Sequence, residues 1–204
     1  MIVARRVLVQ EAFRLEYLTL AWMSIEAAVA IGSGIAAHSI TLLAFGIDSL
    51  IELASAVVLI WRLTVELKHG EAFAEDAERK ASRVGSALLF ALAAYVVVAA
   101  AWSLWTRQSQ DFSWPGVLVA FAAIPVMWVL SGRKLRIAAA LGSHALRADA
   151  VESLTCGWLS IAVVIGLVAQ LVLAAWWIDS VTSLVIVWLL VKEGREAWKA
   201  EDDG

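Results

Sequence analysis

The sequence is poor in charged side chains and in cysteine, and each shortage excludes a class of protein. Only 17% of the 204 residues are charged, whereas 62% are hydrophobic and the mean hydropathy is +0.81. Typical soluble domains are about 25% charged and about 45–50% apolar, so this composition excludes a soluble globule. The single cysteine, Cys156, excludes an intramolecular disulfide. It lies deep in an apolar run, which indicates either an inert packing residue or a buried ligand.

Charged residues are absent from four long stretches, and each stretch exceeds the roughly 20 residues that cross the hydrocarbon core of a bilayer. These stretches are 27–47, 84–106, 112–132 and 153–178, and two shorter ones are 53–61 and 180–191. Together they predict an all-α integral membrane protein with six transmembrane helices. The predicted helices are approximately 18–37, 40–63, 84–105, 115–130, 145–168 and 179–191.

Basic residues gather on one side of these predicted helices. If the first helix starts in the cytoplasm, fifteen of the sixteen Lys and Arg residues lie inside, Lys134 among them, and only Arg107 lies outside. This distribution follows the positive-inside rule and predicts that both termini are cytoplasmic, with the protein in the cell (inner) membrane. Tryptophans cluster at the predicted outer ends, where amphipathic rings prefer to lie: Trp102, Trp105, Trp114, Trp176 and Trp177.

The predicted helices form one domain over residues 1–204. The sizeable connection is 64–83, whose mixed charges predict a solvated cytoplasmic connector with a short helix that runs into the third transmembrane helix. A metal-delivery loop is the weaker interpretation, because His69 is its only imidazole. The polar residues 192–204 are too few for a separate cytoplasmic domain.

Two segments resemble each other across the halves of the chain. Residues 39–52 align without gaps on residues 143–156, with Ser39 on Ser143 and Asp48 on Glu152. Three predicted helices separate the copies, so the copies cross the membrane in opposite directions. The pattern predicts an inverted three-plus-three repeat, which is common in secondary transporters with a substrate site near the membrane midplane. Chance agreement between apolar segments is the alternative.

Acidic side chains inside the apolar runs are the strongest functional signal. They are costly in a bilayer and usually mark ion or proton pathways. The predicted helices contain Glu26, Asp48, Glu52, Asp149 and Glu152.

Two pairs of these residues have helical spacing. Asp48 and Glu52 are four residues apart, so both project from one helix face, and Glu152 and Cys156 repeat this spacing. Counted from the predicted membrane faces, Glu52 and Cys156 lie at a similar depth. The four side chains have the number of ligands that a tetrahedral cation such as zinc requires. The alternative is that each acid is permanently protonated or bonded to a neighbouring hydroxyl.

At these residues the sequence resembles the transmembrane domain of the cation diffusion facilitator (cation efflux) family. The matching stretches are 38–53, 145–160 and 176–199. The resemblance implies a divalent metal that is exchanged for protons. It also implies ligands from Asp-x-x-x-Asp on the second helix and from His-or-Asp-x-x-x-Asp on the fifth. Those positions fall on Asp48, Glu52, Glu152 and Cys156.

Two of these positions depart from the pattern that the family implies. Glu152 stands where zinc transporters of the family have His, which favours harder ions such as Mn²⁺ or Fe²⁺. Cys156 stands where Asp is usual, and its soft thiolate favours Zn²⁺ or Cd²⁺. Zinc and manganese are therefore the main expectations for the transported metal.

The sequence also suggests roles for four further residues. Glu26 is expected to carry protons or to support the ligands of the second helix, and Asp149 to guide ions or to pair with Arg147 or Arg136. Asp179 is expected to be the N-cap of the sixth helix. His38 leads into the motif of the second helix and is a candidate gate contact on the outer side, the alternative being a plain surface residue.

These observations predict a secondary transporter, not an enzyme, that exports a divalent cation in exchange for protons by alternating access. Its expected partners are divalent cations, protons and the lipid bilayer, with no prosthetic group and no nucleic acid. A homodimer through membrane helices is expected from small residues, which are Gly32, Gly34, Ala91, Ala94 and Ala99.

Two other functions remain open at this stage. One is a non-transporting scaffold or regulatory protein that keeps the fold, since the fifth-helix motif is altered. The other is a carrier of a small organic cation, with Trp22 and Trp158 as walls of an aromatic cage.

Overall fold

The computed structural model describes residues 2–69, 75–107, 111–173 and 175–202. The described residues form six helices and no strands. The helices are α1 (Ile2–Ala37), α2 (Ile40–His69), α3 (Glu75–Thr106), α4 (Trp114–Leu141), α5 (His144–Leu173) and α6 (Ile178–Asp202). The prediction of an all-helical membrane fold with six helices is therefore confirmed.

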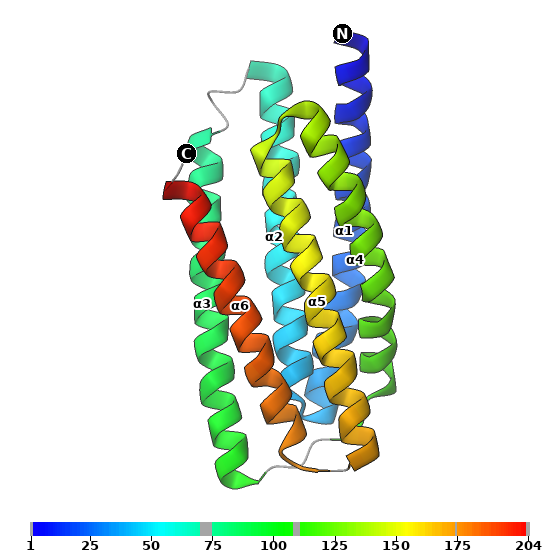
Figure 1. Ribbon diagram of the computed structural model, residues 1–204, viewed down its shortest axis with the longest axis vertical. Coiled ribbons are helices and arrows are strands. Elements are labelled where there is room, and N and C mark those ends of the chain that lie inside the picture. The colour runs from blue at the N-terminus through cyan, green and yellow to red at the C-terminus, as the bar shows by residue number, and fades with distance from the viewer. Residues whose placement is uncertain (1, 70–74, 108–110, 174, 203–204) are drawn as a thin grey trace.

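The helices run up and down in one layered bundle (Figure 1). Helices α1, α2, α4 and α5 pack together, while α3 pairs with α6 beside them. Helix α1 runs away from the chain's N-terminus and α4 runs back toward it, and α2 with α5 and α3 with α6 are likewise opposed. The contacts between α1 and α2 correspond to those between α4 and α5, so the second half repeats the first upside down.

The same turn opens the second helix of each half. His38 and Gly142 both adopt left-handed backbone, at φ 56° and 67°. The amide of the next residue, Ser39 or Ser143, donates to the carbonyl five residues back, at 2.9 Å and 3.0 Å, which is a Schellman ending. Each serine hydroxyl then accepts the amide three residues ahead, at 3.2 Å and 3.3 Å, and so caps α2 or α5. The repeat therefore extends to individual hydrogen bonds.

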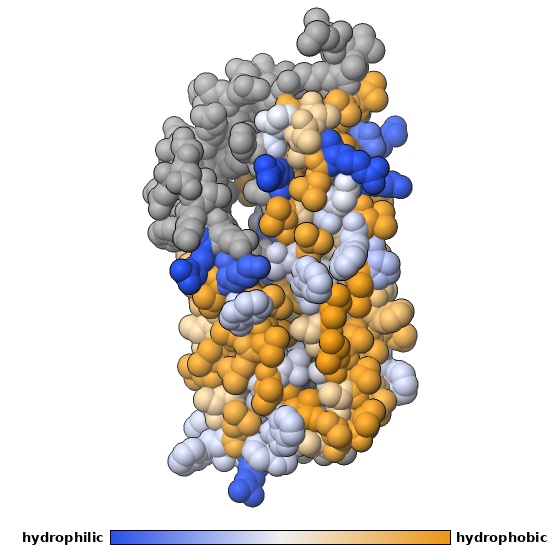
Figure 2. Space-filling view, viewed as in Figure 1, coloured by the Kyte–Doolittle hydropathy of each residue, from blue (hydrophilic) through white to orange (hydrophobic). Residues whose placement is uncertain are grey.

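Apolar side chains cover the outside of the bundle as well as its inside. Figure 2 shows a band of hydrophobic residues across the middle of one face, with hydrophilic residues toward the ends. Val98, Leu118 and Ile165 are each more than 60% exposed. By length and composition, four described helices carry membrane-length apolar spans, which are Val7–Ala37, Ile40–Trp61, Trp114–Leu141 and Asp149–Leu173, and α3 adds the shorter apolar helix Phe90–Thr106.

Several predicted boundaries are wrong, and the helices are longer than the charge-free runs. Helix α1 begins at Ile2 rather than at residue 18, and α4 continues to Leu141 rather than ending at residue 130. Within the predicted connector 64–83, α2 continues to His69. Helix α3 begins at Glu75, which agrees with the predicted short helix that runs into the third transmembrane helix; residues 70–74 lie outside the described part. A helix continues past the end of a charge-free run when its charged side chains are in contact with water or are paired with one another.

One small residue predicted to serve a dimer is used inside the chain instead. A Cβ on Gly34 would lie 2.8 Å from the amide nitrogen of Leu43, so this glycine allows α1 and α2 to approach closely. Gly32, by contrast, faces open space.

Candidate functional site

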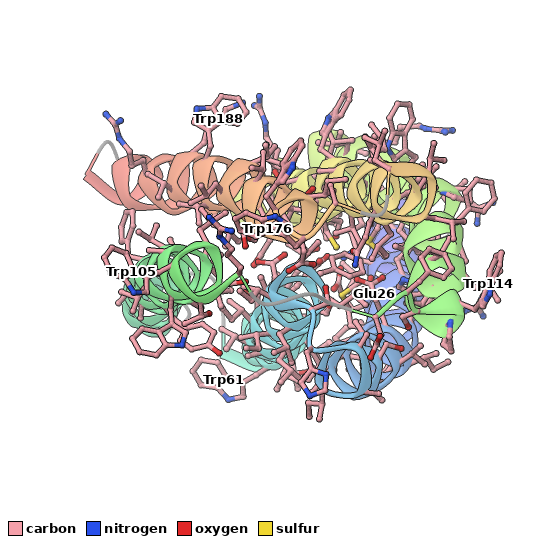
Figure 3. All side chains as sticks on the ribbon, turned by 90° about the horizontal axis from the view of Figure 1, so that it is seen from below. Glu26, Trp61, Trp105, Trp114, Trp176 and Trp188 are labelled. Atoms are coloured by element: carbon pink, nitrogen blue, oxygen red, sulfur yellow. The ribbon has the colours of Figure 1, made fainter. Side chains whose placement is uncertain are left out.

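A group of acidic side chains and the one cysteine lies between α1, α2 and α5. This central cluster consists of Glu26 on α1, Asp48 and Glu52 on α2, and Glu152 and Cys156 on α5. Glu26, Asp48, Glu52 and Cys156 are 0–5% exposed, while Glu152 is half-buried. In Figure 3, Glu26 lies inside the bundle, whereas Trp105 and Trp114 lie at its edges. The structure thus brings together five residues that the sequence singles out.

Glu26 joins all three of these helices through its carboxyl group. One oxygen accepts the indole N–H of Trp22 at 2.6 Å. The other accepts the hydroxyl of Ser49 on α2 at 2.7 Å and the thiol of Cys156 on α5 at 3.5 Å. A carboxyl group with three donors from three helices has a well-defined position.

Helices α2 and α5 exchange two further hydrogen bonds across their interface. Ser153 on α5 donates to Oε1 of Glu52 at 2.8 Å, and Ser55 on α2 donates to Oε1 of Glu152 at 3.1 Å. Oε2 of Glu52 is buried and has no hydrogen-bond partner among the described residues. A buried carboxylate oxygen without a donor is costly, and it is a free ligand atom for a cation.

The remaining members of the cluster interact with Glu52 as well. Asp48 is close enough for an electrostatic interaction with Glu52 and Glu26, and Glu152 interacts in the same way with Glu52. No three His, Cys, Asp or Glu side chains of the described residues stand close enough to hold a metal ion as they are placed. The arrangement supplies oxygen and sulfur ligands that are engaged by hydroxyl groups and by one another.

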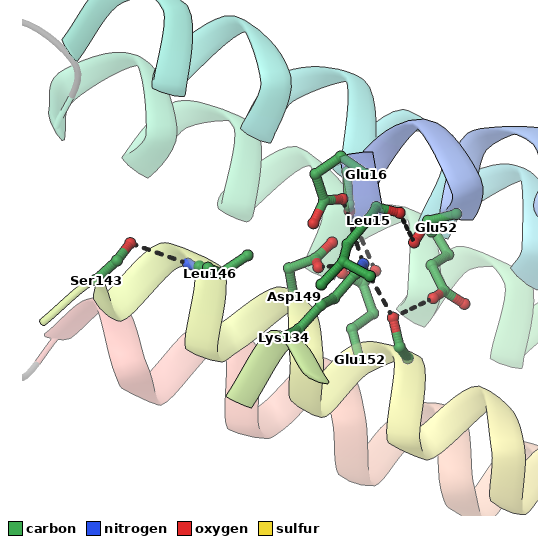
Figure 4. Close-up of polar contacts among 11 residues, drawn as sticks. Leu15, Glu16, Glu52, Lys134, Ser143, Leu146, Asp149 and Glu152 are labelled. Atoms are coloured by element: carbon green, nitrogen blue, oxygen red, sulfur yellow. Dashed lines mark hydrogen bonds and ion pairs between the residues drawn. The ribbon is translucent and has the colours of Figure 1, made fainter. Parts of the chain in front are cut away.

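A second polar group, drawn in Figure 4, surrounds Lys134 and lies nearer the start of α5 than Cys156 does. This lysine cluster consists of Glu16 on α1, Lys134 on α4, and Asp149 and Ser153 on α5. The Lys134 ammonium pairs with Asp149 at 2.5 Å and Glu16 at 3.2 Å, and it donates to Ser153 at 3.4 Å. All three of its donors are used, and Lys134 and Glu16 are fully buried.

The lysine cluster corrects three expectations from the sequence. Lys134 does not lie in the cytoplasm but inside the bundle, because α4 continues about three turns beyond its predicted end at residue 130 and packs Lys134 against α1 and α5. Asp149 pairs with Lys134 and not with Arg147 or Arg136, which are exposed. Glu16 was missed because it precedes the predicted first helix.

A periodic signal for Glu16 is present in the sequence nevertheless. Glu16 falls in register with Ala12, Thr19, Met23 and Glu26, which are spaced three or four residues apart and are all buried. Extending this helical periodicity toward the N-terminus places Glu16 on the inner face of α1.

Asp179 has a different partner from the one predicted. Its carboxylate accepts the hydroxyl of Ser39 at 2.5 Å and the amides of Ile40 and Thr41 at 2.9 Å and 3.4 Å. Asp179 therefore caps α2 rather than its own helix, and it fastens α6 to α2 at the end of the bundle away from the N-terminus. The sequence does not show that Asp179 caps α2, because the two are brought together only by the packing of α6 against α2.

Two further predicted residues lie away from the buried clusters. His38 is exposed in the turn between α1 and α2 at that same end. Trp158 is 51% exposed and packs against Trp128, with ring centroids 5.9 Å apart, on the outer surface. With Trp22 bonded to Glu26, the two tryptophans do not form the walls of one cage.

Comparison with known proteins agrees with this architecture. The model of the cation efflux transmembrane domain matches residues 17–200. An uncharacterized transporter of Synechocystis, sll1263, is 30% identical over 172 residues, which cover 79% of this chain and 55% of that protein. The chain therefore belongs to the cation efflux family and is an integral, multi-pass membrane protein. It spans about half the length of this relative.

Proposed function

We propose that this protein is a secondary transporter that exports a divalent metal cation, of the zinc, manganese, iron or cadmium class, in exchange for protons. The observation that carries the proposal is the central cluster, in which α1, α2 and α5 carry four carboxyl groups and a thiol in the same region of an apolar bundle. Carboxyl groups in such a place need a cation or protons to offset their burial. A site that binds the metal cation and protons alternately couples the transport of the cation to the transport of protons.

The four proposed metal ligands are Asp48, Glu52, Glu152 and Cys156. The unpartnered Oε2 of Glu52 accepts the cation first, and the serine hydroxyl groups that hold Glu52 and Glu152 then give way to the metal. Glu26 holds the thiol of Cys156 and the Ser49 hydroxyl of α2, so it is the proposed proton carrier beside the ligands. Three oxygens and one sulfur suit Zn²⁺ or Mn²⁺ better than Mg²⁺, which prefers oxygen ligands alone.

Metal uptake into proteoliposomes tests the proposal directly. With a proton gradient imposed, vesicles that contain the wild-type protein should take up Zn²⁺ or Mn²⁺, and Asp48→Ala should reduce the initial rate by about tenfold or more, as loss of a buried charged ligand typically does. Glu11→Gln is the matched control, because Glu11 is an exposed acid on α1, and it should transport normally. Equal uptake by wild type and Asp48→Ala would contradict the proposal.

A scaffold or regulatory protein that retains the fold is the second candidate. It is favoured by one observation, namely that no three potential ligands in the described part of the chain stand close enough together to hold a metal ion. Metal binding to the purified protein in detergent separates the two functions. A transporter binds Zn²⁺ or Mn²⁺ stoichiometrically at micromolar concentration and loses this binding in Glu52→Gln, whereas a scaffold binds neither ion.

A further inference from the structure

Among the residues whose burial the structure describes, Lys134 is the one buried basic side chain, and it lies beside the acidic groups that the proposed transport uses. A buried ammonium is stable only if carboxylates and hydroxyl groups satisfy its charge and its donors. Here Glu16 of α1 and Asp149 and Ser153 of α5 do so. One side chain of α4 therefore fastens two other helices together through ionic hydrogen bonds.

The lysine cluster lies nearer the N-terminal end of the bundle than Cys156 of the central cluster does. Along α5, Asp149 and Ser153 precede Cys156 by about two turns and one turn. The two clusters are also joined directly, because Ser153 accepts from Lys134 and donates to Glu52. On a route between α1, α4 and α5 from that end, Lys134 therefore precedes Glu52.

Each of the two carboxyl groups around Lys134 has one oxygen without a hydrogen-bond partner in the described part of the chain. Oε1 of Glu16 and Oδ1 of Asp149 are buried and have no hydrogen-bond partner among the described residues. These two oxygens can therefore accept a further cation or donor without first losing a hydrogen bond.

We propose that Lys134 is the positioning residue that closes the N-terminal end of the cation route. In the closed arrangement its ammonium holds Glu16 and Asp149 together, and through Ser153 it also orients Glu52. When these bonds break, α4 separates from α1 and α5, and the route to Glu52 opens. The inference rests on the proposed function in one respect: the route that Lys134 closes is the route of the exported cation.

The single cysteine makes the proposal testable without added labels. Cys156 is 1% exposed and lies beyond the lysine cluster as seen from the N-terminal end. Its rate of alkylation by a membrane-impermeant, charged thiol reagent therefore reports how often that end opens. The reagent is applied to intact cells and to inverted membrane vesicles, with a tag at the N-terminus identifying which side faces the N-terminal end.

Lys134→Met should raise the alkylation rate of Cys156 by about tenfold or more, because it removes three hydrogen bonds to a charged group. The increase should appear only when the reagent reaches the N-terminal end. Arg133→Met is the matched control, since Arg133 is the exposed neighbour on α4, and its rate should stay within about twofold of wild type. Lys134→Arg should label at an intermediate rate, because a planar guanidinium does not reproduce three converging bonds.

An unchanged alkylation rate of Cys156 in folded Lys134→Met would overturn the proposal. An equal increase in the rate from both sides of the membrane would also overturn it, because it indicates that the whole bundle has become less tightly packed. If Lys134→Met does not fold, Asp149→Asn provides the same test, because it weakens the shortest of the three bonds and keeps the lysine. Alkylation does not depend on transport. A failed uptake assay with side-specific labelling would therefore contradict the proposed function alone, and normal uptake with unchanged labelling would contradict this inference alone.

Discussion

At the level of single residues, serine hydroxyl groups hold the buried carboxyl groups of the central cluster. Ser49 donates to Glu26, and Ser153 donates to Glu52. The two serines occupy equivalent positions of the repeat. A hydroxyl group suits a site that binds a cation reversibly. It donates a hydrogen bond to the carboxylate when no cation is bound, and because it is neutral, it can turn away from the carboxylate without moving a charge.

His38 shows how a candidate gate residue can have a local structural role. Its backbone is left-handed at φ 56°, and its counterpart in the second half is Gly142 at φ 67°. For a residue with a Cβ this conformation costs about 1–2 kcal/mol, so the repeat has a strained turn in one half and a relaxed turn in the other.

His38→Gly is expected to raise the free energy of unfolding by roughly 0.5–1 kcal/mol, because glycine adopts the left-handed turn without strain. Thermal unfolding in detergent measures this change. His38→Ala is the control and should not be stabilised, because it keeps a Cβ. The gate role predicts that both variants lose metal uptake equally, and normal uptake by both would remove His38 from the cation route.

At the level of helices, two glycines allow α1 and α2 to pack closely beside the central cluster. Gly34 lies against the backbone of Leu43, and Gly46 of α2 lies against Ile31 in the same way, with a Cβ on Gly46 only 2.9 Å from the amide nitrogen of Ile31. These contacts set the distance between the helices that carry Glu26, Asp48 and Glu52.

Gly34→Ala should lower the free energy of unfolding by about 1–3 kcal/mol, because the new methyl group meets backbone that cannot move aside easily. Gly32→Ala is a closely matched control two residues away on α1, where nothing lies within 4 Å of the new carbon. It should be neutral or stabilising by up to about 1 kcal/mol, through helix propensity. Equal effects of the two substitutions on thermal unfolding in detergent would show that Gly34 does not set this contact.

For the molecule as a whole, the two ends of the bundle differ in the polar bonds that join their helices. At the N-terminal end Lys134 joins α1, α4 and α5 by ionic bonds. At the opposite end Asp179 joins α6 to α2 through hydrogen bonds to Ser39, Ile40 and Thr41. Five of the exposed tryptophans lie toward the second end, as expected of rings at a membrane interface: Trp102, Trp105, Trp114, Trp176 and Trp177.

The distribution of Lys and Arg leads us to expect the N-terminal end in the cytoplasm. Burial of Lys134 removes one charge from this count, and the remaining basic residues keep the same asymmetry. Protease added to inverted membrane vesicles should therefore remove a tag at the N-terminus, whereas protease added to intact spheroplasts should not. A tag inserted between Arg107 and Asp111 should behave in the opposite way. Cleavage of the N-terminal tag from outside would reverse the proposed direction of transport.

The membrane class, the helical fold and the inverted repeat follow from the sequence alone, because each depends on local patterns. Apolar runs long enough to cross a bilayer require helices, and the aligned Asp48 and Glu152 mark equivalent places in opposed helices. The residues of the central cluster are recognisable for the same reason, since an acid inside an apolar run is costly without a role.

The partners of the charged groups were decided only by the tertiary structure. Lys134 is expected in the cytoplasm from the sequence and Glu16 lies outside the predicted first helix, yet packing of α1, α4 and α5 buries both and pairs them across 118 positions of sequence. Asp179 likewise caps α2 across 139 positions. A buried charge is tolerated only where an opposite charge or a donor meets it. The sequence specifies which residues carry such charges, but only helix packing determines which ones meet.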